Sequence, residues 1–379
     1  MVKVSVVRCD NYNEKLLIEK ILKSLETFGG IEKFVKPGDK VLLKPNLLSA
    51  KPAASCITTN PYFTKVCAQI FKDYGCRTSV GDSPPVQSST KVAKKSGLLD
   101  ELKKIDVPLI EFKDPVKLPI HKNALFKDIY IAKEVMEADH IINLPKIKSH
   151  TQMTITACVK NIFGVVVGKE KPMWHLKAGT DKEYFSHMLL DLYCSVSPTL
   201  TIADMIMVME GNGPSSGRPK EVGAILTGTD CVAMDRVICD ILDIPLELAY
   251  MLNEAKKFSD LESDLNNIEI ISDGLDEIIK KAKGFMLPRK TEVDFGLPPF
   301  LKRLLREHLT SKPIIDKNLC RFCKACEDIC PANVITIEGE EISFDYDKCI
   351  ECFCCQEMCS FNALKVKQGI LLKMINHYK

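Results

Sequence analysis

The sequence predicts an α/β domain with a mostly parallel sheet and helices on both faces, followed by a small α+β domain. Three observations support this prediction. Short apolar runs rich in β-branched residues alternate with amphipathic stretches up to about residue 245, chain-breaking residues follow, and a cysteine-rich repeat closes the sequence. Alternating strand and helix patterns are typical of a parallel sheet between two helical layers.

The expected strands are apolar segments that end in polar or turn-forming residues. They are Val2–Val7, Lys40–Pro45, Arg77–Val80, His140–Leu144, Leu200–Val208 and Val222–Leu226. The main expected helices are Glu14–Leu25, Tyr62–Tyr74, Phe185–Val196 and Cys231–Leu242, each with one apolar side. Residues 246–283 add further helix and one short strand, Ile268–Ser272, so that the α/β domain covers residues 1–285.

A segment rich in chain breakers separates the two predicted domains. Residues 286–311 form the expected linker, which contains Pro288, Gly296, Pro298 and Pro299. A connecting helix is expected at Phe300–Leu309, and the C-terminal domain at residues 312–379.

The C-terminal domain contains an internal repeat whose two copies lie 29 residues apart. Each copy reads C-x2-C-x2-C-x3-C. In two-cluster ferredoxins, three closely spaced thiolates bind one [4Fe–4S] cubane and the fourth cysteine binds the other. This rule predicts two [4Fe–4S] clusters: one held by Cys320, Cys323, Cys326 and Cys359, the other by Cys349, Cys352, Cys355 and Cys330.

Zinc is the alternative metal, because the same thiols offer four soft ligands to each site. Zinc sites do not generally repeat this triple spacing twice at one offset, so the pattern favours cubanes. Pro331 follows the first copy, whereas Ser360 follows the second, which alters a turn and removes no ligand. Cys354 is either a packing residue or a competing ligand during misassembly. The domain resembles bacterial two-cluster ferredoxins over residues 312–368, which implies one-electron transfer.

Composition restricts the cellular setting of the protein. With 379 residues and a formal net charge of +2, the chain gives no reason to expect nucleic acid as a partner. No apolar run approaches the roughly 20 residues of a membrane span, and the N-terminus lacks signal-peptide features, so we expect a cytoplasmic protein. Eight of the 17 cysteines lie singly in the first 240 residues. We expect them to be buried thiols, which suits a reducing, anaerobic cell.

Polar residues recur where the strands of the α/β domain end, so they are expected to meet at one rim of the sheet. The cationic candidates for binding a carboxylate or phosphate are Lys44, Lys146, Lys148 and Lys160. Asn46, Asn161 and Asn212 are candidate hydrogen-bond donors to that anion, and Asp82 and His150 are candidate proton carriers. Taken singly, each is explained as a solvated lysine or a turn residue, but their recurrence favours a site. His175 is either a lid residue or surface packing.

Familiar cofactor motifs are missing from the sequence. It contains no phosphate-binding loop of the nucleoside triphosphatases and no nucleophile elbow. The run from Gly211 to Gly217 departs from the dinucleotide fingerprint, because its spacing differs and Pro214 interrupts it. We expect a hairpin-like loop there.

Six spaced segments resemble the domain of unknown function 362 family. They are Val41–Asn46, Gly81–Pro84, Asn143–His150, Lys160–Gly164, Gly211–Pro214 and Thr229–Asp235. The resemblance covers roughly residues 1–245, and Ser149 stands where a threonine is common in the family. Members often carry a ferredoxin-like segment, so the resemblance implies this architecture and leaves the substrate open.

These observations predict an iron–sulfur oxidoreductase component that passes electrons through two clusters to an anionic small molecule or bound cofactor at the rim. The alternative is a non-catalytic electron carrier whose α/β domain docks a redox partner protein, with the rim lysines facing an acidic surface. A third possibility is that the clusters are structural or sense the redox state.

Overall fold

A ten-stranded sheet organises the larger domain of this computed structural model, which describes residues 1–168, 170–289 and 308–377. Eight strands follow the order β12 (Ile268–Asp273), β1 (Val2–Arg8), β11 (Arg218–Gly228), β10 (Leu200–Glu210), β7 (His140–Leu144), β2 (Lys40–Pro45), β3 (Arg77–Asp82) and β4 (Leu109–Glu111). Two short strands, β8 (Lys146–His150) and β9 (Thr154–Thr156), attach at β10. The segments predicted as strands are therefore confirmed.

The part of the sheet that carries the rim is parallel. β7, β2 and β3 are neighbours and run in the same direction, so their carboxyl ends lie side by side. β10 joins them in parallel through β7, whereas β11 is antiparallel to both β10 and β1. The loop Gly211–Gly217 connects β10 to β11, as the hairpin prediction requires. The mostly parallel sheet is confirmed.

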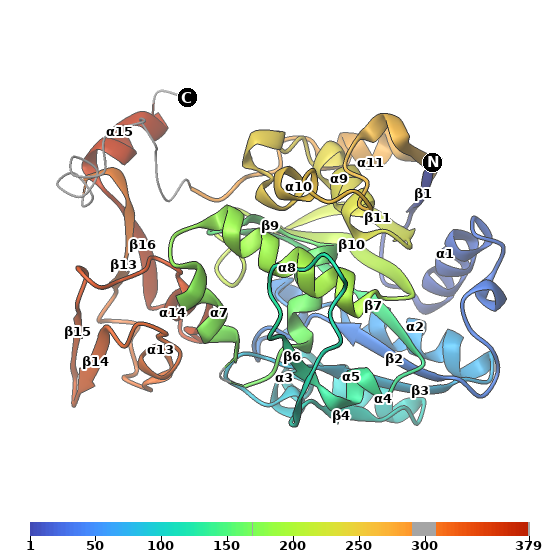
Figure 1. Ribbon diagram of the computed structural model, residues 1–379, viewed down its shortest axis with the longest axis horizontal. Coiled ribbons are helices and arrows are strands. Elements are labelled where there is room, and N and C mark those ends of the chain that lie inside the picture. Colours follow the sequence, from blue (N-terminus) through green and yellow to red (C-terminus); the bar gives the residue numbers. More distant parts are fainter. Residues whose placement is uncertain (169, 290–307, 378–379) are drawn as a thin grey trace.

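Helices cover both faces of the sheet because successive strand side chains point in opposite directions (Figure 1). On β2, Val41 and Leu43 belong to one core and Leu42 to the other. The first core contains α1 (Glu14–Glu26), α2 (Pro61–Asp73), α3 (Ser89–Ser96) and α4 (Leu98–Lys104). The second contains α5 (Lys133–Met136), α6 (Cys158–Asn161), α7 (Glu170–Ala178), α8 (Lys182–Val196), α9 (Cys231–Ile241), α10 (Tyr250–Ala255) and α11 (Leu275–Ala282).

Local sequence signals start several of these helices. Asn13 and Asn60 cap α1 and α2 by accepting hydrogen bonds from backbone N–H groups of the first turn, and Pro61 suits the first position of α2. Seven of the eight scattered cysteines are buried and Cys194 is half-buried, which confirms that most of them are core thiols. Within residues 1–168, 170–289 and 308–377, no helix has both the length and the apolarity of a membrane span.

The small C-terminal domain consists of two strand–loop–helix–strand units and lies beside α7 (Figure 1). The first unit contains β13 (Ser311–Ile315), α13 (Ala325–Asp328) and β14 (Ile335–Glu338); the second contains β15 (Glu341–Phe344), α14 (Cys354–Met358) and β16 (Leu364–Gln368). β13 pairs with β16 and β14 with β15, both antiparallel. Helix α15 (Ile370–His377) follows. The expected linker and the helix Phe300–Leu309 fall mostly on residues 290–307, outside the described residues.

A separate two-stranded sheet completes the larger domain. It consists of β5 (Pro115–Lys117) and β6 (Tyr130–Ala132), which pair in antiparallel fashion.

Candidate functional site

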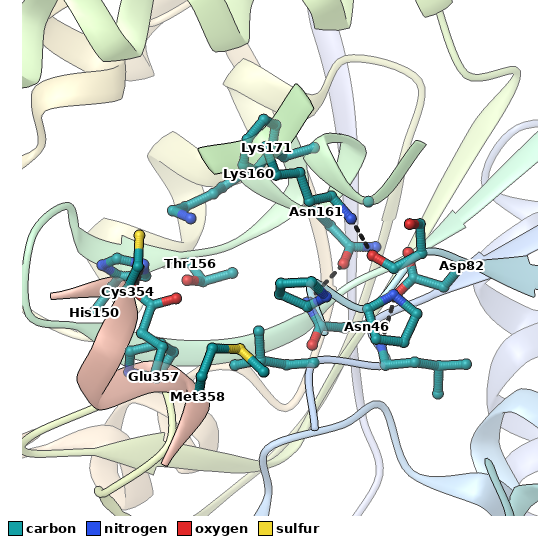
Figure 2. Close-up of a pocket in the computed structure, with 18 of the residues that line it drawn as sticks. Asn46, Asp82, His150, Thr156, Lys160, Asn161, Lys171, Cys354, Glu357 and Met358 are labelled. Atoms are coloured by element: carbon teal, nitrogen blue, oxygen red, sulfur yellow. Dashed lines mark hydrogen bonds and ion pairs between the residues drawn. The ribbon is translucent and has the colours of Figure 1, made fainter. Parts of the chain in front are cut away.

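A cavity lies where the rim of the large sheet meets the C-terminal domain (Figure 2). It contains about 720 Å³ of space between protein atoms, part of it open to solvent. On one side are the ends of β2 and β3, strands β8 and β9, and helices α6 and α7. On the other side are Ile329 and three residues of α14, Cys354, Glu357 and Met358. The two domains therefore form this cavity together.

The Lys44 ammonium and the Asp82 carboxylate form a buried ion pair at the strand ends, with Nζ 2.7 Å from Oδ1. The second carboxylate oxygen of Asp82 accepts the Leu47 N–H at 2.6 Å. Burial lowers the pKa of Lys44, and the charge of Asp82 opposes that shift. Gly164 lies so close to this pair that a Cβ atom there would contact both charged groups. The pair is held by packing as well as by charge.

A chain of amides holds Lys148 in place. Lys148 Nζ donates to Asn46 Oδ1 at 2.8 Å and to the carbonyl of Ile57 at 2.7 Å. Asn46 Nδ2 donates to Asn161 Oδ1 at 3.0 Å, and Asn161 Nδ2 donates to Asn143 Oδ1 at 2.8 Å. The side-chain amides of Asn46 and Asn161 are thus hydrogen-bonded to other protein groups. They position Lys148, rather than presenting free amides to a ligand.

Two lysines in the cavity wall have strongly depressed pKa values. Burial lowers the pKa of Lys148 to about 7, and the nearby charge of Lys160 contributes to the shift. Burial likewise lowers the pKa of Lys171 to about 7, opposed by Asp82 and reinforced by Lys44 and Lys160. Lys171 lies on α7 and donates to the carbonyl of Ser83. Near neutral pH both side chains are therefore partly neutral amines, which take up a proton when an anion binds nearby.

Lys160 on α6 is the least compensated of the cavity lysines. Among residues that the structure describes, its ammonium makes no hydrogen bond or ion pair, and it lies 5.9 Å from the ring centroids of both Phe163 and Phe185. Burial lowers its pKa, opposed by Glu357 and Cys354. Figure 2 shows the side chain extending across the cavity towards Cys354. Asp235 holds α6 in this position by accepting the Cys158 and Val159 N–H groups.

His150 and Glu357 meet across the boundary between the domains, with Nε2 3.1 Å from Oε1. His150 Nδ1 accepts hydrogen bonds from the N–H groups of Gln152 and Met153, so Nε2 carries the ring proton and faces the carboxylate. Burial and the charge of Lys160 lower the pKa of His150 to about 4. Burial alone would raise the pKa of Glu357, but its partners hold it below the usual range. At neutral pH the pair is neutral imidazole and carboxylate.

Two further polar groups in the cavity wall have no partner. Thr156 Oγ1 and His175 Nδ1 are buried and make no hydrogen bond in the described part of the chain. Thr156 is 4% exposed and His175 is 6% exposed. Figure 2 shows Thr156 between the His150–Glu357 pair and Asn46. Buried polar groups without partners are uncommon and cost free energy, so their presence in a cavity wall indicates a ligand.

The structure brings together seven of the nine rim candidates around the cavity, with the Asn161 amide also supporting Asn46. Lys146 lies elsewhere: its register partner on β10 is Asp204, and the two form a buried ion pair of 2.8 Å. Asn212 is exposed, because Gly213 packs against Ser149 and turns the neighbouring side chain outward. Both placements correct the expected convergence.

Sequence reasoning missed Lys171, Thr156 and Glu357, which follow no recognisable motif. His175 is neither a lid nor surface packing, because its ring is buried and stacks on Phe185 with 4.5 Å between centroids. Only the fold reveals the role of these four residues. Glu357 could be suspected from its position between Cys355 and Cys359, since any side chain there lies near a cluster.

The two copies of the cysteine repeat meet in the C-terminal domain. A hollow is lined by Cys330, Cys349, Cys352 and Cys355 together, which brings the last cysteine of the first copy to the second copy. Phe322 and Lys324 have positive φ angles of 48° and 61°, and Glu351 and Phe353 repeat them at 56° and 57°. Such left-handed residues turn backbone N–H groups towards an anionic centre.

Hydrogen bonds to sulfur support the same arrangement. Val334 N–H donates to Cys330 Sγ at 3.4 Å, and Ala363 N–H donates to Cys359 Sγ at 3.2 Å. Hydrogen bonds of this kind stabilise thiolates and help to set cluster potentials. No three His, Cys, Asp or Glu side chains in the described ranges converge as around a single metal ion. A cubane requires no such convergence, because each thiolate binds a different iron.

Comparison with known proteins matches both domains. The family model described as Domain of unknown function (DUF362) matches residues 41–240. The chain belongs to this family. A model described as a 4Fe-4S dicluster domain matches residues 312–360 of the DUF362 protein. The C-terminal domain therefore carries two [4Fe–4S] clusters and serves electron transfer.

Two similar proteins are also known. The thylakoid-associated protein sll1697 of Synechocystis sp. is 43% identical over 246 residues, which cover 64% of the DUF362 protein and 76% of that relative. The lactate racemase apoprotein from Thermoanaerobacterium thermosaccharolyticum has a TM-score of 0.40 at 9% identity. That match covers 62% of the DUF362 chain and 56% of the racemase, so the chain spans little more than half of it.

Proposed function

We propose that this DUF362 protein is an oxidoreductase component. It accepts electrons from a redox partner protein and passes them through its two clusters to an anionic small molecule or bound cofactor in the cavity. One observation carries the proposal: the ammonium of Lys160, which makes no hydrogen bond or ion pair in the described part of the chain, faces a cavity whose opposite wall is α14, the helix that contains Cys355 and ends just before Cys359.

The lysines support an anionic occupant. Removing an ammonium group from water without a partner costs several kcal/mol, so a protein that buries Lys160 in this way gains free energy when an anion binds. Lys148 and Lys171 reinforce the same preference, since burial lowers their pKa values to about 7 and a bound anion favours their charged forms. No phosphate-binding backbone loop is needed for such a site.

The position of α14 supports electron delivery to that occupant. Consecutive residues of this helix face different sides: Cys354 lines the cavity, whereas Cys355 packs in the core of the cluster domain with Val334 and Ile335. Bound clusters supply one-electron chemistry at this wall. Met358 and Ile329 fill the wall with apolar atoms, which exclude water from the route.

The proposed ligand sets each combine three cysteines of one copy with the last cysteine of the other copy. We assign Cys349, Cys352, Cys355 and Cys330 to one cluster, because these four side chains line one hollow. The remaining set, Cys320, Cys323, Cys326 and Cys359, holds the other. Cys354 is then a cavity residue and not a ligand.

Reduction of a bound molecule consumes protons as well as electrons, and the cavity offers two kinds of donor. Asp82 and His150 line it, but Asp82 is committed to Lys44 and His150 is already neutral at pH 7. Lys148 and Lys171 have pKa values of about 7, which suits a general acid at neutral pH. We therefore infer that these lysines deliver protons and that Asp82 and His150 position them. A reducing, cytoplasmic setting remains part of the proposal.

The test uses the reconstituted protein with its clusters reduced by dithionite and the excess removed. Reoxidation is followed by absorbance after addition of fumarate, crotonate, oxaloacetate or pyruvate. We expect at least one anion to reoxidise the clusters, and Lys160→Met to slow this at least about tenfold, as loss of one charge contact implies. Lys177→Met is the matched control, because Lys177 is exposed on α7. Equal rates in both variants, or no reoxidation by any anion, would favour the electron carrier instead.

A further inference from the structure

The charges around the cavity do not cancel. The charged side chains that line it are Lys44, Asp82, Lys148, Lys160, Lys171 and Glu357. Lys44 and Asp82 neutralise each other at 2.7 Å. Three lysines then face one carboxylate, which leaves two positive charges in excess when all the lysines are protonated.

The excess lies on two sides of the cavity. Lys171 contacts the carbonyl of Ser83, next to Asp82 and the end of β3. Lys160 extends towards Cys354 and Glu357 on the opposite side, as Figure 2 shows. A single small oxyanion cannot contact both regions equally, whereas a molecule with an anionic group at each end can.

The negative charge of the clusters does not remove this excess. Cys355 packs in the core of the cluster domain, whereas Cys354 lines the cavity, so a cluster held by Cys355 would be on the side of α14 away from the cavity. A lysine outside the cavity also lies near a cluster ligand. Lys51 Nζ donates a hydrogen bond to Asn362 Oδ1 at 2.6 Å, and Asn362 is three residues after Cys359. The far side of the cavity around Lys171 gains little from cluster charge, since opposite charges interact less as their separation grows.

Two hydrogen-bonding groups of the cavity wall are available to such a molecule. Thr156 Oγ1 and His175 Nδ1 are buried in the wall and unpartnered in the described part of the chain. Anionic oxygens accept hydrogen bonds readily, so a ligand with two anionic groups offers acceptors to both the lysines and the Thr156 hydroxyl. Phe163, Met358 and Pro214 supply apolar surface for the carbon atoms that join its two ends.

We infer that the cavity selects a small dianion whose two anionic groups are separated by a short carbon chain, as in a dicarboxylate. The Lys160 side holds one group and the Lys171 side holds the other. This inference rests on the proposed function only in using the same cavity, and it adds the charge and shape of the occupant.

The test measures binding to the oxidised holoprotein without turnover. Trp174 is the single tryptophan, it is buried, and its ring lies 5.4 Å from that of Phe163 in the cavity wall. Its fluorescence is titrated with succinate, butyrate and inorganic phosphate, with calorimetry as a second readout. We expect succinate to bind at least about tenfold more tightly than butyrate or phosphate. Lys160→Met and Lys171→Met should each remove that advantage, and Lys177→Met should retain it.

Each other outcome is decisive. Butyrate binding as tightly as succinate would overturn the dianion inference and leave the proposed function standing, because an anion still binds. Phosphate binding more tightly than succinate would overturn the separation of the two anionic groups. No binding of any of the three anions would overturn the inference and the proposed function together.

Discussion

The imidazole Nε2 of His150 on β8 lies 3.1 Å from the carboxylate Oε1 of Glu357 on α14. This contact joins the rim of the α/β domain to α14, the helix that contains Cys355 and ends just before Cys359. Ser215 strengthens the same junction by donating to the carbonyl of Glu357 at 2.9 Å. The cavity therefore exists only while the two domains are in contact.

Replacing Glu357 by glutamine should tighten anion binding. The amide has the shape of the carboxylate and can still face His150 Nε2, but the negative charge that opposes an anion near Lys160 is gone. We expect succinate to bind roughly tenfold more tightly, which corresponds to about 1.4 kcal/mol. Titration of Trp174 fluorescence measures the change. Glu341→Gln, at an exposed position on β15, is the control and should leave affinity unaltered; weaker binding in Glu357→Gln would contradict the charge argument.

Anion binding should weaken as pH rises above about 7. Lys148 and Lys171 have pKa values of about 7 in the free protein, so both are increasingly neutral at higher pH and offer less charge to the ligand. The dissociation constant of the anion, measured between pH 6 and pH 9, should rise with pH. In Lys148→Met and Lys171→Met it should rise less steeply than in the unaltered protein. A flat profile for the unaltered protein would show that these lysines do not contact the anion.

The same lysines give the anion-free protein a stability that increases with pH. Folding depresses their pKa from the ordinary value of 10.5, so unfolding takes up protons between about pH 7 and pH 10.5. The penalty of burying the charged forms is full below pH 7 and fades as pH rises through that window. Denaturant unfolding at pH 7 and pH 9, with Lys171→Met for comparison, should show a smaller difference in the variant.

Replacing Gly164 by alanine should disrupt the Lys44–Asp82 pair. A Cβ atom at this position would contact both charged groups, and neither is a freely moving side-chain end, because both are buried. We expect a loss of about 1–3 kcal/mol of stability, the usual cost of overpacking. Thermal unfolding measures it. Gly97→Ala is a useful contrast, since nothing lies within 4 Å of a Cβ atom there and only its positive φ of 88° opposes the change.

Replacing single cysteines should distinguish the cluster ligands from cysteines that only lie close to a cluster. Cys354→Ala should retain about eight irons per chain, the content of two four-iron cubanes, whereas Cys355→Ala should lose one cluster. Cys359→Ala should affect the cluster of Cys320, Cys323 and Cys326, although it lies in the second copy. Iron and sulfide analysis with electron paramagnetic resonance distinguishes these outcomes. Loss of iron in Cys354→Ala would show that this thiol is a ligand after all.

The spacing of residues along the chain predicted much of the site. The cysteine repeat specifies cluster ligation because a cubane must be gripped by closely spaced thiolates, and that requirement is local in sequence. Lys44, Asn46 and Asp82 were predicted to meet because they end neighbouring parallel strands, and strand ends in such a sheet share one rim. His150 and Lys160 follow from the same argument.

The sequence by itself thus determined the two clusters, the α/β sheet and the rim that holds the lysines, since each depends on short-range patterns. Only the tertiary structure decided which lysines face the cavity. Lys146 turns to Asp204, 58 residues away, because a buried ammonium goes to the nearest buried carboxylate. Lys171, Thr156 and Glu357 join the site through contacts between distant segments and between domains. No local pattern encodes such contacts, because they depend on how complete elements pack.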